Sequence, residues 1–340
     1  MTTPGSTGQR TGLREAAAGR LAIGTAVSGH ESDRRGMPLW HEARYRQVLA
    51  AEFSSLTGEN QMKWEWLQPE PGEFDFAAAD AIVDFALDHD QQVRGHTLLW
   101  HNQNPAWITE ENLSPDQLRE ALRHHIHTVV GRYAGRIHHW DVVNEIIDDD
   151  GQLRTQENPW LAVLGREIVA DAFIWAHEAD PDALLFGNDF DVEAIGPKSD
   201  AWYELLRDLR AEGVPVHGFG VQGHLDLSRP YPEDFGANLR RFADLGLRTA
   251  ITELDIRGPV GDDGTFSTEH QERQVDWYRR VLRTALATPD LETVTLWGVL
   301  DEQSWVPGWF PGTGQALLMH RDYEPKPAYH AVHEVLAEFA

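Results

Sequence analysis

The chain has 340 residues, with 55 acidic against 29 basic side chains and a formal net charge of −26. This charge disfavours nucleic acid and anionic membranes as partners, because both are bound through basic residues that neutralise phosphate. The absence of cysteine excludes disulfides and thiol nucleophiles, and the absence of any apolar run of about 18 residues excludes a membrane-spanning helix.

The N-terminal end is rich in Thr, Gly and Ser and has no apolar segment before Leu13. We predict that residues 1–11 form a disordered tail and that residues 12–340 form one folded domain. Because this end lacks the apolar core of a secretory signal, the protein is either cytoplasmic or secreted from a form whose signal has been removed. No partner protein is implied.

Eight β-rich runs alternate with helical stretches along the rest of the chain. Such alternation at this length favours a single (β/α)8 TIM barrel over an open doubly wound sheet. The segment from Gly24 to Gly29 lacks the spacing of a dinucleotide-binding motif, which argues against a Rossmann fold. The predicted strands lie near 21–27, 53–57, 92–99, 137–143, 183–188, 217–222, 248–253 and 293–299. The predicted helices lie near 13–20, 77–88, 115–134, 160–178, 198–212, 232–244, 268–287 and 326–338.

In such a barrel, catalytic groups gather at the C-terminal ends of the strands. The fourth strand runs from Trp140 to Asn144 and Glu145, and the acidic, turn-forming segment 148–151 follows. Glu145 therefore emerges from a strand into a loop, where a carboxylate is a candidate proton donor. Taken alone, a surface position or a helix cap is the commoner outcome for such a side chain.

The seventh strand supplies a second carboxylate. Glu253 and Asp255 are two residues apart and therefore share one face of the strand. Two inward carboxylates at the end of an apolar strand destabilise the fold unless they are paired or used. We hypothesise that His224, at the end of the sixth strand, links to Asp255, orients Glu253 and helps keep it ionised.

Polar and aromatic side chains follow the remaining strand ends. Their directional donors and acceptors suit sugar hydroxyls, and their indoles suit the C–H faces of sugar rings. For any single residue of this set, a place in the first turn of a helix or in the hydrophobic core explains its presence as well as sugar binding does. The set consists of Glu59, Asn60, Lys63, His96, Trp100, Gln222, His224, Trp297 and Trp305.

Two carboxylates at one barrel mouth are the arrangement used for glycoside hydrolysis. One carboxyl protonates the leaving oxygen while the other attacks the anomeric carbon, and their environments must keep one protonated and the other ionised. Asn144, beside Glu145, suits a hydrogen bond to the sugar 2-hydroxyl. No cofactor or metal is needed for this chemistry.

From about Gly24 to about Ala331, the chain closely resembles the glycoside hydrolase family 10 endo-β-1,4-xylanases. Several separate motifs carry the resemblance, and all occur in the family's order. They are Glu59-Asn60 with Lys63, Arg94-Gly-His96-Thr-Leu-Leu-Trp100-His101, Trp140-Asp-Val-Val-Asn144-Glu145, Gln222 with His224, Thr252-Glu253-Leu-Asp255, Trp297-Gly with Trp305, and Pro325-Lys-Pro-Ala-Tyr329.

The resemblance implies that Glu145 is the acid/base and Glu253 the nucleophile of a retaining, covalent double displacement on xylan or xylo-oligosaccharides. It also implies that the strand-end set lines the subsites for the glycone, the sugar that keeps the anomeric carbon. In the family, the equivalents of Gln103 and Trp305 crowd the space of a glucose hydroxymethyl group. Asn188 and Phe190 fall where an aromatic side chain often contacts the aglycone.

Other functions stay open at this point. Gly58, Leu300 and His320 depart from the family pattern, and an endo-β-1,4-glucanase or mannanase would carry the same glutamate pair on the same fold. A non-catalytic sugar-binding barrel is disfavoured because both carboxylates are present. A metal-dependent hydrolase is disfavoured because His124 and His127 lie on a predicted helix and no histidine cluster with ligand spacing follows the strands.

Overall fold

The computed structural model describes residues 11–28, 37–110 and 113–339. The tail predicted for residues 1–10 lies outside these ranges. Thr11, which the same prediction included, is hydrogen-bonded to the body of the protein, with its Oγ1 3.0 Å from Nε2 of His333 in the last helix. No helix in the described ranges is long and apolar enough to cross a membrane.

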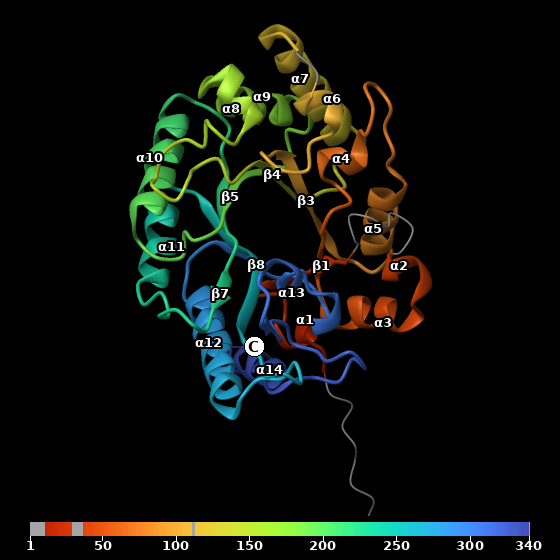
Figure 1. Ribbon diagram of the computed structural model, residues 1–340, viewed down its shortest axis with the longest axis vertical. Helices are drawn as coiled ribbons and strands as arrows, with labels where there is room; N and C mark the ends of the chain where they lie inside the picture. Colours follow the sequence, from red (N-terminus) through yellow and green to blue (C-terminus); the bar gives the residue numbers. More distant parts are fainter. Residues whose placement is uncertain (1–10, 29–36, 111–112, 340) are drawn as a thin grey trace, which may run out of the picture.

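Eight parallel strands form a closed barrel within the described residues, as the alternating sequence pattern predicts (Figure 1). The first strand pairs with the last, Ala22 opposite Thr293, and the last also pairs with the long strand before it, Thr249 opposite Leu291. The barrel strands are β1 (Ala22–Val27), β2 (Ser55–Gly58), β3 (Gln92–Leu99), β4 (His139–Asn144), β5 (Leu184–Asp189), β6 (Gly218–Val221), β8 (Arg248–Pro259) and β9 (Leu291–Leu296).

Strand β8 is twice as long as its prediction, because two short strands pair with its outer half. They are β7 (His224–Asp226), which runs parallel to it, and β10 (Thr313–Gly314), which runs antiparallel. These pairings carry β8 beyond the barrel to Pro259. The loops after β6, β8 and β9 are thereby joined into one wall at the barrel mouth.

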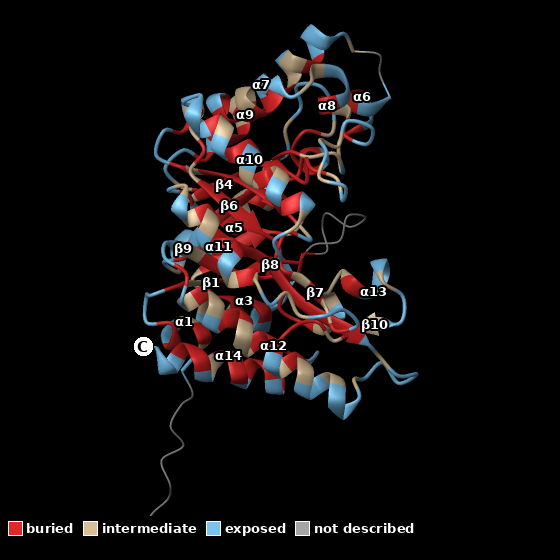
Figure 2. Cartoon of the chain, turned by 90° about the vertical axis from the view of Figure 1, so that its left-hand side faces the viewer, coloured by how far each residue is buried: buried red, intermediate tan, exposed pale blue. Residues whose placement is uncertain are grey.

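Helices surround the barrel and bury their apolar faces against it, so that the red strands in Figure 2 lie inside a partly blue shell. They are α1 (Leu13–Ala16), α2 (Pro38–His41), α3 (Ala43–Glu52), α4 (Trp64–Leu67), α5 (Ala77–Asp88), α6 (Ala106–Thr109), α7 (Pro115–Arg132), α8 (Pro159–Leu164), α9 (Glu167–Ala179), α10 (Pro197–Ala211), α11 (Phe235–Asp244), α12 (Thr268–Leu286), α13 (Val306–Trp309) and α14 (Pro327–Glu338).

One predicted helix is divided in the structure, and one longer helix was missed. The helix expected at 160–178 is divided into α8 and α9 by Gly165, whose φ of 70° suits glycine and ends the first helix. Helix α3 was not expected, although Tyr45, Val48 and Leu49 bury one face of it at helical spacing. Its charged and polar residues hid that pattern.

Polar side chains fill much of the barrel interior below the mouth. Arg94 on β3 and Asp141 on β4 are fully buried and point inward, whereas the residues beside them in sequence, Gly95 and Trp140, face the helices. The Trp140 ring lies across Gly95, and a Cβ built on Gly95 falls 2.1 Å from that ring. The glycine therefore lets Trp140 fill the space between the sheet and the outer shell.

We expect the substitution Gly95→Ala to destabilise the protein by about 3 kcal/mol, because a rigid, buried indole must move to admit the methyl group. Gly131→Ala is the matched control. Gly131 lies in helix α7 with nothing within 4 Å of an added Cβ, so alanine there should stabilise by about 0.5–1 kcal/mol. Urea unfolding measures both changes, and unchanged stability of Gly95→Ala would contradict this packing.

Candidate active site

A cavity of about 1000 Å³ opens at the C-terminal ends of the barrel strands. Glu145, immediately after β4, and Glu253, on β8, both line it. These two strands are separated in the sheet only by β5 and β6. The barrel therefore brings together two carboxylates that are far apart in sequence.

The backbone of Glu145 is held in an unusual conformation. Its φ of 55° lies in the left-handed region, which costs a non-glycine residue on the order of 1 kcal/mol or more. Two hydrogen bonds hold it there: its N–H donates to the Asn188 carbonyl at 2.9 Å, and its carbonyl accepts from Nε of Arg154 at 3.1 Å. This turn directs the carboxylate into the cavity.

Three neutral donors surround the Glu145 carboxylate. Its Oε1 accepts from Asn144 Nδ2 at 3.0 Å and from Gln222 Nε2 at 2.9 Å, and its Oε2 accepts from Trp100 Nε1 at 2.8 Å. His101 Nδ1 lies 3.9 Å from the same Oε2. These donors fix the direction of both oxygens without adding a permanent charge beside them.

Glu253 is surrounded by cationic groups instead. Its Oε2 is 3.3 Å from His224 Nε2, and its Oε1 is 3.6 Å from an Arg94 guanidinium nitrogen. Burial raises the pKa of Glu253, but the charges of His96, His224 and Arg94 and the His224 hydrogen bond outweigh it, so that the pKa falls to about 2. Glu253 is thus ionised at neutral pH.

His224 is itself anchored by Asp255, as the sequence predicted. Nδ1 of His224 lies 3.1 Å from Oδ2 of Asp255, and the same oxygen accepts from Trp305 Nε1 at 2.8 Å. Burial lowers the pKa of His224, but the nearby carboxylates of Asp255 and Glu253 raise it by more, so that the resulting pKa is about 10. The imidazolium therefore stands between two buried carboxylates.

Two asparagines connect the carboxylates below the cavity floor. The Asn188 amide nitrogen donates one hydrogen to Asn144 Oδ1 and the other to Glu253 Oε1, both at 2.8 Å. Asn144 in turn donates to Glu145. Since Thr252 Oγ1 donates to Asn188 Oδ1, the orientation of the Asn188 amide is fixed, and the chain of bonds runs from one carboxylate to the other.

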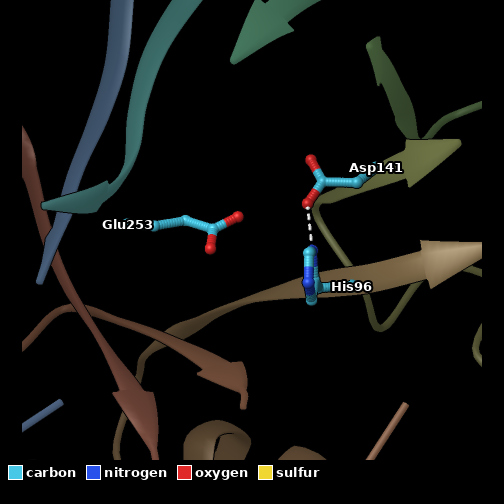
Figure 3. A group of neighbouring side chains, drawn as sticks. All are labelled: His96, Asp141 and Glu253. Carbon is cyan, nitrogen blue, oxygen red and sulfur yellow. Dashed lines mark hydrogen bonds and ion pairs between the residues drawn. The ribbon is translucent and has the colours of Figure 1, made fainter. Parts of the chain in front are cut away.

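His96, Asp141 and Glu253 lie close enough together to be considered as a metal-ligand set, each with an oxygen or nitrogen within 4.8 Å of the others (Figure 3). His96 Nδ1 is 2.8 Å from Asp141 Oδ2, and Arg94 is paired with the same Asp141 oxygen. A permanently charged guanidinium thus already balances these carboxylates, and a metal ion here would have to displace it.

The wall formed after β2 and β3 carries short polar contacts. Asn60 Oδ1 accepts from Lys63 Nζ at 2.9 Å and from Gln103 Nε2 at 3.2 Å. The Lys63 ammonium also lies 4.7 Å from the centre of the Trp100 ring. On the other side, Lys198 lies 3.4 Å from the centre of the Phe190 ring and 2.9 Å from Asp189 Oδ1. A buried lysine thus lies beside an aromatic ring in both places, and of these two lysines Lys63 lines the cavity.

Most of the predicted site residues line this cavity. Asn144, Asn188 and Asp255 do not, because their side chains are fully buried beneath it. For Asn188 the prediction of an aglycone contact is wrong, since its amide is used to hold Glu253. The predicted residues that do line the cavity are Glu59, Asn60, Lys63, His96, Trp100, Gln103, Glu145, Phe190, Gln222, His224, Glu253, Trp297 and Trp305.

Several residues of the site were assigned no role from the sequence. Arg94 and Asp141 were quoted within motifs without a role, although two-residue alternation places Arg94 on the same inward face as His96. The loop residues gave no comparable signal, because loop conformation does not follow a period. The further lining residues are Ser28, Pro38, Glu42, His101, Asn102, Arg154, Asp191, Arg229, Arg257, Gln303, Ser304, Gly308, Trp309 and Phe310.

Comparison with known proteins gives a consistent result. The family model described as glycosyl hydrolase family 10 matches residues 12–335. Endo-1,4-beta-xylanase B of Thermotoga neapolitana is 42% identical over 87% of this chain and 84% of its own length, and a beta-1,4-xylanase of Dictyoglomus thermophilum is 39% identical over 93% and 89%. The structure of xylanase 10B from Thermotoga petrophila RKU-1 in complex with xylobiose is 39% identical, with a TM-score of 0.91 over 97% of this chain and 98% of that one.

The pairing of His224 with Asp255 can be tested without any assay of activity. Asp255→Asn keeps the shape but removes the negative charge, so the pKa of His224 should fall from about 10 by at least one unit. NMR titration of the His224 ring nitrogens measures this change. Asp263→Asn, on an exposed loop, is the charge-matched control and should leave the titration unchanged; an unaltered His224 in Asp255→Asn would show that Asp255 does not hold the imidazolium.

Proposed function

The chain belongs to glycosyl hydrolase family 10, and we propose that it is a retaining endo-1,4-β-xylanase that cleaves internal bonds of xylan or xylo-oligosaccharides. One observation carries the proposal: a buried, ionised Glu253 and a neutral-donor-bound Glu145 line the same cavity, whose walls hold four tryptophans. This is the pair of differently surrounded carboxyl groups that glycoside hydrolysis requires.

In the first step Glu253 attacks the anomeric carbon and forms a covalent ester with the sugar, while the glycosidic C–O bond breaks. Glu145, in its protonated form, gives its proton to the leaving oxygen. In the second step the Glu145 carboxylate takes a proton from water, and the resulting hydroxide displaces Glu253. Two inversions restore the original configuration at the anomeric carbon, and both carboxyl groups return to their starting forms.

The surroundings of the two groups support these roles. His224 and Arg94 keep Glu253 ionised and hold it in place as a nucleophile. Glu145 changes its protonation state twice in each turnover, and its partners, Trp100, Gln222 and Asn144, are neutral in both states. The predicted contact of Asn144 with a sugar 2-hydroxyl also stays part of the proposal. The Asn144 amide nitrogen donates to Glu145 Oε1 and its amide oxygen accepts from Asn188, so its second amide hydrogen is the one assigned to the sugar.

Two lines of evidence support xylose units as the preferred sugar. Gln103 and Trp305 both line the cavity, where the family resemblance assigns them to the space of a hexose hydroxymethyl group. Trp305 is also fixed there by its bond to Asp255, so it cannot easily turn away to admit a larger sugar. The relatives reported above are named xylanases, which agrees with this preference.

The wild-type enzyme should hydrolyse xylan faster than carboxymethylcellulose or mannan, and proton NMR should show a β-anomer as the first product. Glu253→Ala should lower turnover by at least about 10³-fold, because no covalent intermediate can form. Reducing-sugar release measures both. Faster cleavage of cellulose or mannan would reject the substrate, and a Glu253→Ala variant with wild-type rates would reject the nucleophile.

Glu145→Ala should affect substrates according to their leaving groups. An aryl xylobioside with an acidic phenol leaves without protonation, whereas a xylosyl leaving group requires it. We therefore expect kcat/KM to fall by about 10²-fold or more on xylo-oligosaccharides and far less on the aryl glycoside in its first step, followed as a burst of phenol. Equal losses in that first step would argue against Glu145 as the acid.

A further inference from the structure

Trp309 is the most exposed tryptophan among the described residues, with 70% of its surface open to solvent. It lies at the end of the short helix α13, in the loop after β9, and it lines the same cavity as Glu145 and Glu253. Neither the catalytic steps nor the family motifs give it a role. Its place in a cleft wall, beside the Trp305 ring, makes this exposed indole a candidate surface for binding a ligand.

The segment that carries Trp309 is well held. The Gly308 N–H donates to the Trp305 carbonyl at 3.1 Å, and the Phe310 N–H donates to the Val306 carbonyl at 2.8 Å. Val306 is fully buried, and Thr313 pairs with Pro259 of β8. Trp309 therefore projects from an ordered turn, which reduces the entropy lost when a ligand binds to it.

The neighbours of Trp309 form an aromatic wall that continues outward from the catalytic centre. The Trp305 ring lies 6.2 Å from the Trp309 ring and 5.6 Å from the Phe310 ring, and Arg257 lies 3.8 Å from the centre of the Phe310 ring on a further side. Trp305 itself contacts Asp255 and lies beside His224. The wall thus leads from the groups that hold Glu253 to an open indole at the rim.

The edge of Trp309 is open as well as its face. Within the described part of the chain its indole N–H makes no hydrogen bond, whereas the N–H groups of Trp100 and Trp305 are used by Glu145 and Asp255. A flat apolar face with a neighbouring free donor matches a pyranose ring, which presents C–H groups on one side and hydroxyls at its edge.

We propose that Trp309 forms an additional sugar-binding subsite, at which a xylosyl ring of the substrate backbone stacks on the indole, beyond the rings that an aryl xylobioside places in the cleft. This inference rests on the proposed function for the identity of the sugar. A pyranose or furanose side group would offer the same C–H face, so the test includes decorated and undecorated chains.

The test compares Trp309→Ala with the wild type on an aryl xylobioside and on xylotriose to xylohexaose. For the longer chains we expect kcat/KM to fall by about threefold to tenfold, mainly through a higher KM, because the contact is equal in the ground and transition states. The aryl xylobioside, which is too short to reach the rim, should be unaffected. Trp309→Phe should restore part of the loss.

Trp40→Ala is the matched control. Within the part of the chain that the structure describes, Trp40 is the second exposed tryptophan, with 37% of its surface open, and it is not among the residues that line the cavity. The Trp40→Ala substitution should leave kcat/KM unchanged on every substrate. An arabinosyl-substituted xylo-oligosaccharide of the same backbone length shows whether the stacked ring belongs to the backbone or to a side group. If Trp309→Ala lowered kcat/KM only on this substituted substrate, the assignment to the backbone would be overturned.

Two results would overturn the subsite itself. One is a Trp309→Ala variant with wild-type values on every chain length, and the other is an equal loss on the aryl xylobioside and on xylohexaose. Calorimetric binding of xylohexaose to Glu253→Ala and to Glu253→Ala with Trp309→Ala gives a readout independent of turnover. A wild-type enzyme that is inactive on xylan would refute the proposed function, whereas equal binding by these two variants would refute the subsite alone.

Discussion

The balance of buried charge inside the barrel is the constraint on which the rest of the site depends. Asp141, Glu253 and Asp255 are almost completely removed from water, and an unpaired carboxylate there would cost several kcal/mol. Arg94 and protonated His224 supply the opposite charges at short range. Removing either cation would leave a buried anion, so these two residues stabilise the fold and maintain the reactivity of Glu253 through the same contacts.

This network also explains why Glu145 and Glu253 differ. Glu253 lies among cations and takes a pKa of about 2. Among the described residues, the side-chain donors at hydrogen-bond distance from the Glu145 carboxylate are the neutral N–H groups of Trp100, Gln222 and Asn144. Neutral donors can remain in place while a carboxyl group gains and loses a proton. The barrel thus gives two chemically identical side chains different surroundings by presenting them from β4 and β8.

Much of the fold and of the site could be predicted from sequence because both follow from periodic rules. Alternation along the strands placed Glu253 and Asp255 on one face, and the position of strand ends placed His224 beside them. The role of Asn188 was not predicted, because its amide lies below the cavity floor and bonds to side chains from two other strands. Which side chains meet there is not readable from the sequence around Asn188. Trp309 and Arg257 were missed since they belong to a loop and to the unforeseen extension of β8, where no period applies.

Closure of the barrel has a consequence for how the chain folds. Strand β1 has β2 on one side, but on the other side its partner is β9, some 270 residues later, where Thr293 Oγ1 donates to the Ala22 carbonyl. Until the end of the chain is available, β1 keeps an unpaired edge, which is a site for mispairing. Such distant contacts slow folding, so the ring is completed only when nearly the whole chain has left the ribosome.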